Sequence, residues 1–167
     1  MTDIPQLDHP PMEWANAVST RPSLEGAVKD VVEQLKHRLT GAPDLGIVFI
    51  SSSFTSEFAR LLPLLHDLLP IPALVGCSGG GIVGMDDQGH PQELENTPAL
   101  SLTLARLPGV TVRSFHLSSD DLPDLDSPPQ AWSELMGVAP EANPQFILMA
   151  DPFSSSVTDL LQGLDFA

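Results

Sequence analysis

Positively charged side chains are scarce in this sequence, and they end early. The 167 residues contain seven Lys and Arg against 22 Asp and Glu, which gives a formal net charge of −15 at pH 7. No Lys or Arg follows Arg113, so the last third of the chain carries only negative charge. Proteins that bind nucleic acid or anionic membranes need clustered cations to displace counterions. We therefore expect neither partner, and we interpret the acidity as a solvated surface.

Cysteine and long apolar segments are also nearly absent. Cys77 is the only cysteine, which excludes a disulfide within the chain and favours a reducing compartment. The first residues lack the basic start and apolar centre of a signal peptide, and no apolar run reaches the length of a membrane span. We therefore expect a cytoplasmic protein. The five histidines are scattered without the spacing of a metal site, so we expect no metal and no cofactor.

Periodicity divides the chain into helices and strands. Residues 1–11 are rich in Pro and Asp, and we expect them to be loose, with order from Met12 onward. Helical spacing of apolar residues predicts helices, with Pro63 kinking the second of them or displacing its start. These helices cover residues 24–39, 55–69, 130–136 and 157–164. The two tryptophans, Trp14 and Trp132, are interpreted as packing residues rather than binding platforms.

Alternation predicts a strand over residues 12–19, and short apolar runs predict strands over 45–50, 72–76 and 146–150. Alternating residues on both sides of Pro108-Gly109 predict an antiparallel hairpin formed by 98–107 and 110–117. The expected fold class is therefore α/β: a mixed β-sheet with parallel strands and an antiparallel hairpin, flanked by helices.

The segment 72–84, PALVGCSGGGIVG, places the single cysteine within a run of glycines. Successive glycines permit positive φ or a close backbone approach, which indicates either a crossover turn or a loop lying against a ligand. Residues 76–80 fit the G-x-S-x-G pattern, with Ser78 or Cys77 as nucleophile, but the residues after it are a poor helix start. No Lys follows the glycines, which argues against a phosphate loop. A lone cysteine is commonly a small buried side chain.

Three loops of small polar residues follow predicted strands, at 51–53, 77–81 and 151–156. Ligands of open α/β sheets bind at strand ends, beside helix N-termini, so these loops would converge if their strands are parallel neighbours. Backbone amides and hydroxyls would hold a carboxylate, and Asp151 an ammonium, which suggests an amino acid as ligand. Asp151 could equally cap the turn that follows it. The candidate ligand-binding residues are Ser51, Ser52, Ser53, Cys77, Ser78, Gly79, Gly80, Gly81, Asp151 and Ser154.

Several segments in this order resemble the N-terminal FIST domain, named for F-box and intracellular signal transduction proteins. They are MEWANAVSTRPSLEGAV, the Ser-Ser-Ser-Phe turn, VGCSGGGIVG, LSLTLARLPGV and FILMADPFSSSVTDLLQGLDFA. The resemblance covers nearly the whole chain from Met12. Its glycine segment commonly reads Gly-Cys-Ser-Thr-x-Gly, which is matched by Gly76, Cys77, Ser78 and either Gly80 or Gly81, whereas Gly79 stands at the Thr position.

The resemblance implies a sensory or ligand-binding module for signal transduction, for which small ligands such as amino acids have been proposed. Family members usually continue beyond Ala167, so it also implies a partial domain over 12–167 and a C-terminal FIST region as partner. We expect a module without catalysis of its own. Two alternatives stay open: a protein-interaction module, and a Ser/Cys hydrolase that uses the GCSGG loop.

Overall fold

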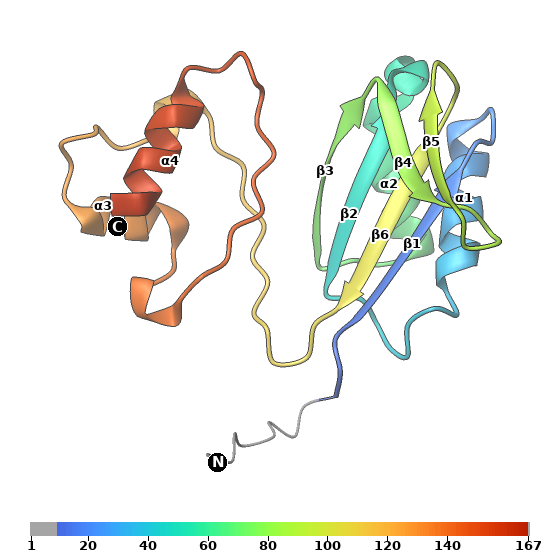
Figure 1. The fold of residues 1–167 in the computed structure, drawn as a ribbon, viewed down its shortest axis with the longest axis horizontal. Helices are drawn as coiled ribbons and strands as arrows, with labels where there is room; N and C mark the ends of the chain where they lie inside the picture. The colour runs from blue at the N-terminus through green and yellow to red at the C-terminus, as the bar shows by residue number, and fades with distance from the viewer. Residues whose placement is uncertain (1–9, 167) are drawn as a thin grey trace. The chain divides into compact units, whose positions relative to one another are not determined.

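The computed structural model describes residues 10–166, so most of the segment expected to be loose lies outside the described residues. The chain divides into two compact units at the boundary between Ser114 and Phe115. The first unit contains the β-sheets and two of the helices, and the second contains the other two helices (Figure 1).

A four-stranded sheet in the order β1-β6-β2-β3 forms the centre of the first unit. Its strands are β1 (Glu13–Ser19), β2 (Leu45–Ser51), β3 (Ala73–Gly79) and β6 (Leu100–Arg106). Strand β6 runs antiparallel to both of its neighbours, whereas β2 and β3 are parallel. The mixed sheet predicted from the sequence is therefore confirmed, and β3 lies at one of its edges.

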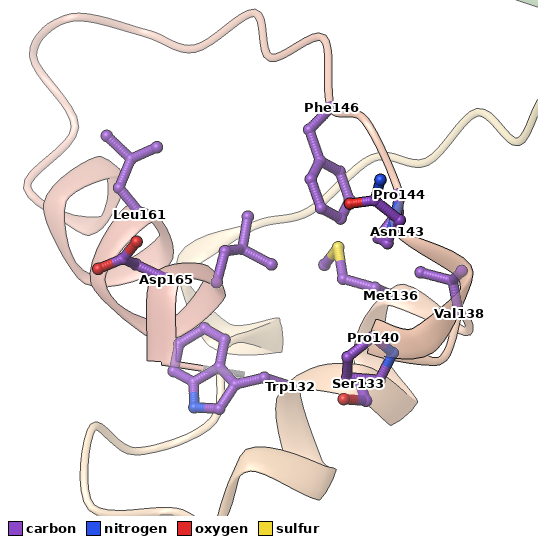
Figure 2. A pocket seen from close by; sticks show the side chains of 11 residues that line it. Trp132, Ser133, Met136, Val138, Pro140, Asn143, Pro144, Phe146, Leu161 and Asp165 are labelled. Carbon is purple, nitrogen blue, oxygen red and sulfur yellow. The ribbon is translucent and has the colours of Figure 1, made fainter. Parts of the chain in front are cut away.

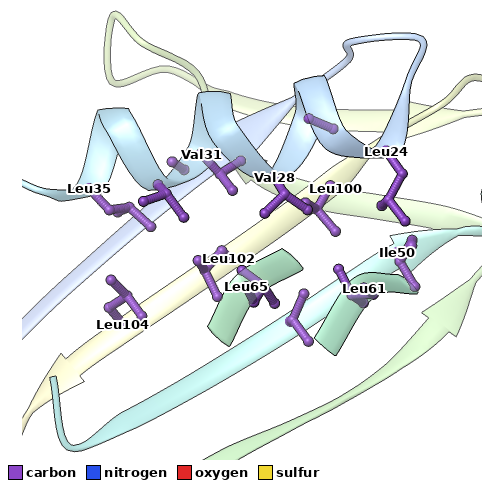
Figure 3. Packing of buried hydrophobic residues seen from close by; sticks show 14 of the residues in the cluster. Leu24, Val28, Val31, Leu35, Ile50, Leu61, Leu65, Leu100, Leu102 and Leu104 are labelled. Carbon is purple, nitrogen blue, oxygen red and sulfur yellow. The ribbon is translucent and has the colours of Figure 1, made fainter. Parts of the chain in front are cut away.

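Helices α1 (Leu24–Leu35) and α2 (Phe58–Leu68) pack on one face of this sheet (Figure 3). The Ser23 hydroxyl caps α1 by accepting a hydrogen bond from the Gly26 N–H. A 3-10 helix, η1 (Ser52–Glu57), precedes α2, and Pro63 lies inside α2 without ending it. The helices and strands share one apolar core, which includes Leu24, Val28, Val31, Leu35, Ile50, Leu61, Leu65, Leu100, Leu102 and Leu104.

The antiparallel hairpin lies in a different place from the one predicted. Strands β4 (Gly81–Met85) and β5 (Pro91–Glu95) pair with each other in a separate two-stranded sheet. Residues 110–117 form no strand, so the predicted hairpin around Pro108-Gly109 is wrong. The physical reason is that β6 already pairs with β1 on one side and β2 on the other, which leaves no free edge for the segment after it.

The hairpin packs closely on the sheet. Ile82 lies in a small apolar cluster with Val18 and Ala99. A Cβ atom built at Gly84 would lie 2.7 Å from the Val18 Cβ, so the glycine allows β4 to approach β1. The Asp86 carboxylate accepts hydrogen bonds from the N–H groups of Gln88 and His90, which closes the turn.

The second unit consists of helices α3 (Pro129–Met136) and α4 (Ser156–Phe166), with 3-10 turns η2 (Ser119–Asp121) and η3 (Pro140–Ala142). Both helices were predicted. The predicted strand over 146–150 is wrong: this segment is largely exposed, and no other segment between 115 and 166 is a strand that could pair with it. An unpaired strand leaves its backbone N–H and C=O groups to solvent.

The two tryptophans differ in their surroundings. Trp132 of α3 is fully buried, which confirms the packing role predicted for it. Trp14 is 53 % exposed on the edge strand β1, so the same prediction is wrong there. A side chain on an edge strand has a neighbouring strand on one side only.

Candidate functional site

The ends of β2 and β3 bring two of the three predicted loops together. The strands are parallel, and their register places Ser51 opposite Gly79. The end of β2, from which residues 52–53 continue, thus lies next to the end of β3, from which residues 80–81 continue, as expected if the two strands were parallel neighbours. We call Ser52, Ser53 and Cys77–Gly81 the glycine edge, and all of these residues except the half-buried Gly79 are exposed.

Ser51 serves the fold rather than the surface. It is buried, and its hydroxyl oxygen accepts hydrogen bonds from the N–H groups of Ser53 and Ala99, each at 3.3 Å. The first bond caps η1, and the second joins the end of β2 to the start of β6. Ser51 is therefore an unsuitable ligand contact, in contrast to the exposed Ser52 and Ser53.

Cys77 and Ser78 are exposed residues of strand β3 rather than loop residues. The expectation that Cys77 is a buried side chain is wrong, because β3 is an edge strand with a neighbouring strand on one side only. The hydroxyls of Ser52, Ser53 and Ser78 make no hydrogen bond to any other group between residues 10 and 166. These three hydroxyls are available to a bound molecule.

The glycines of this region differ in whether a side chain would fit at their position. None of Gly76, Gly79, Gly80 and Gly81 has positive φ. A Cβ built at Gly76 would lie 1.9 Å from the Val48 carbonyl oxygen, so this glycine is required by the close approach of β3 to β2. A Cβ built at Gly80 meets nothing within 4 Å. Packing therefore explains Gly76 and gives no reason for Gly80.

A carboxylate that sequence reasoning missed lies at the glycine edge. The hairpin register places Glu95 opposite Gly81, and Glu95 Oε1 lies 3.8 Å from a Cβ built on that glycine. The pairing of β4 with β5 creates this neighbour. The signal in the sequence was the Asp-Gln-Gly turn that separates two short alternating segments, 81–85 and 91–95.

Asp151 and Ser154 belong to the second unit, and no strand precedes them. The argument from parallel strand ends therefore does not apply to the third loop. The Asp151 carboxylate accepts a hydrogen bond from the Phe153 N–H at 2.9 Å, and its carbonyl accepts one from the Ser154 N–H at 3.0 Å. The capping alternative for Asp151 is thus confirmed.

The second unit holds an apolar pocket of about 400 Å³ between α3 and α4 (Figure 2). Sequence reasoning missed it, because the two helices are separated by almost twenty residues of irregular chain. Close contact between the helices frames it: a Cβ built at Gly163 would lie 2.4 Å from the Trp132 ring. The pocket is lined by Trp132, Ser133, Met136, Val138, Pro140, Asn143, Pro144, Phe146, Leu161, Leu164 and Asp165.

The arrangement around Ser78 differs from a nucleophile elbow. An elbow places its nucleophile on a turn from a strand to a helix, whereas β3 continues through Gly80 directly into β4. In the part of the chain that the structure describes, neither Cys77 nor Ser78 has a His or carboxylate hydrogen-bonded to its side chain. The same residues contain no group of three His, Cys, Asp or Glu that could hold a metal ion.

Between residues 10 and 166, no helix combines the length and the apolar character needed to cross a membrane.

The fold defines an α/β protein whose mixed sheet carries helices on one face. The FIST N domain family model matches residues 44–167, and the chain therefore belongs to this family of sensory domains of signal-transduction proteins. No curated protein and no solved structure shows significant similarity to the chain.

Proposed function

We propose that this FIST N domain senses a small ligand and binds it at the glycine edge, in a reducing compartment such as the cytoplasm. One observation carries the proposal. At Gly80, in an exposed segment two residues after Ser78, a Cβ would have no other atom of the described residues within 4 Å. Glycine there is not required by packing or by positive φ, and close approach of a ligand to the backbone is a reason for it.

The chemistry of the edge supports an amino acid as the ligand. The hydroxyls of Ser52, Ser53 and Ser78 can donate hydrogen bonds to a carboxylate. The Glu95 carboxylate, beside Gly81, can accept an ammonium. Glu95 takes the role that sequence reasoning gave to Asp151, which belongs to the second unit and accepts the Phe153 N–H within its own turn.

We also propose that the domain is not an enzyme. The absence of an elbow turn and of a base bonded to Ser78 or Cys77, within residues 10–166, supports this proposal. An electrophilic acyl probe should therefore label neither residue. Labelling that disappears in Ser78→Ala or Cys77→Ala would contradict it.

A protein-interaction role is the second candidate, and one observation favours it. Strand β3 is an edge strand with exposed residues from Gly76 to Ser78, and extended peptides can add to such an edge by backbone pairing. Partner capture that is insensitive to Gly80→Val and to Glu95→Gln would favour this role over ligand sensing.

Calorimetry and thermal shift with the twenty amino acids, on the full chain, test the sensing proposal. Gly80→Val and Glu95→Gln should each weaken binding, the first by obstruction and the second by loss of the ammonium partner. Asp151→Asn removes the same charge as Glu95→Gln at a turn outside the glycine edge, and it should leave affinity unchanged. If no amino acid binds, or if the three variants behave alike, the glycine edge is not the ligand site.

A further inference from the structure

The pocket of the second unit is apolar on most of its wall and carries one carboxylate. Phe146 and Leu161 line it and are 39 % and 51 % exposed, and Met136 lines it although most of its surface is buried. Figure 2 shows Phe146 and Met136 on the side of the pocket opposite Leu161 and Asp165. Asp165 is exposed and is the only ionisable residue of the lining.

The charges around the pocket all have one sign. The second unit contains no Lys or Arg, and His116 is its only side chain that can become cationic. No ion pair engages Asp165 in the described residues. The potential at the pocket is therefore negative, which attracts cations and repels anions. The carboxylates of this unit are Asp120, Asp121, Asp124, Asp126, Glu134, Glu141, Asp151, Asp159 and Asp165.

We propose that this pocket is a second binding site, independent of the glycine edge, and that its occupant is a small apolar amine. A ring or short aliphatic chain lies against Met136, Phe146 and Leu161, and the ammonium lies beside Asp165. The volume of about 400 Å³ is at the small end of the range for ligand pockets, which suits one ring rather than a peptide.

The charge of the unit distinguishes an amine from an amino acid. An amino acid adds a carboxylate, which the surrounding acidic residues repel and for which this pocket has no cation. A simple amine has no carboxylate, so its only charge is the ammonium, which pairs with Asp165. The two proposed sites thus select different ligands, and variants of one should not affect the other.

Trp132 provides the readout because it lines the pocket. The only other tryptophan of the sequence is Trp14, which can be replaced. In a Trp14→Phe background the fluorescence of Trp132 reports on the pocket alone. The probes are 2-phenylethylamine, 2-phenylethanol and 3-phenylpropanoate, which share a ring and differ in charge. We expect the amine to bind with a Kd on the order of 1 mM or tighter, the alcohol more weakly, and the carboxylate least.

Matched variants locate the ammonium. Asp165→Asn should weaken amine binding by about threefold to fivefold and leave alcohol binding unchanged. Unchanged alcohol binding also shows that the pocket is folded in this variant. Glu134→Gln removes the same charge from an exposed residue of α3 outside the lining and should change neither, and Gly80→Val should not affect the amine. Equal binding of the three probes, equal effects of the Asp165 and Glu134 variants, or no binding up to about 10 mM would overturn the proposal.

Discussion

Gly76 and Gly80 lie four residues apart in one glycine-rich segment, and the structure gives them opposite sensitivities to substitution. A Cβ at Gly76 would overlap the Val48 backbone carbonyl, which is held in the paired strand β2. We expect Gly76→Ala to lower the free energy of unfolding by about 1–3 kcal/mol or more, because strand backbone must move. Gly80→Ala places its methyl group in open space, and the change should stay within about 0.5 kcal/mol. Urea denaturation of both variants checks this, and equal midpoints would contradict the close approach of β3 to β2.

Glu13 gives the first unit a pH-dependent contribution to stability. Hydrogen bonds from the Thr40 hydroxyl and backbone N–H, with a further contribution from Arg106 at 3.0 Å, lower the pKa of this carboxyl. Because the folded-state pKa is lowered, the contribution is present above the ordinary glutamate range and is lost as the pH falls through the folded-state value.

We expect Glu13→Gln to be less stable than the parent at pH 7 and the difference to shrink as the pH falls below the ordinary glutamate range. Unfolding free energies measured from pH 7 to below that range test the expectation. Glu25→Gln is the control, because the Glu25 carboxylate is 73 % exposed and meets only Arg60, at 3.9 Å. A pH-independent deficit in Glu13→Gln would show that the carboxylate charge does not matter there.

At the scale of elements, the contact of α3 with α4 depends on one small residue. Glycine has a lower helix propensity than alanine, so this effect by itself would make Gly163→Ala more stable by about 1 kcal/mol. The methyl group would lie 2.4 Å from the Trp132 ring, and overpacking of this kind costs about 1–3 kcal/mol. We expect a net loss of stability and a change in Trp132 fluorescence. Gln162→Ala, on an exposed position of the same helix, should produce neither effect.

At the scale of the whole molecule, exposed apolar side chains and net charge act against each other. Phe146, Ile147, Met149 and Phe153 are 39 %, 59 %, 38 % and 94 % exposed, which favours self-association. The formal charge of −15 opposes it by repulsion that salt screens. We expect association to increase between about 0.01 and 1 M salt, as measured by sedimentation, and Phe153→Ser to reduce it. An unchanged monomer mass across this range would contradict the expectation.

The sequence by itself determined the elements whose side-chain pattern is local. Helix α1 follows from the apolar spacing of Leu24, Val28, Val31 and Leu35, and β2 follows from a continuous apolar run, because burial of one face or of both faces imposes these periods. The sequence also predicted that the loops after β2 and β3 meet if these strands are parallel neighbours, and the structure supplies that condition by pairing Ser51 with Gly79.

Only the tertiary structure decided which strand pairs with which, and which glycine is needed for packing. The pattern around Pro108-Gly109 is compatible with a hairpin, but β6 lies between β1 and β2, and a strand has only two edges. Gly76 and Gly80 are identical in sequence terms and differ in whether a neighbouring strand occupies the space of a Cβ. The pocket likewise depends on the contact of Gly163 with Trp132, two residues thirty-one positions apart. Each of these outcomes rests on contacts between distant segments, which local propensity does not encode.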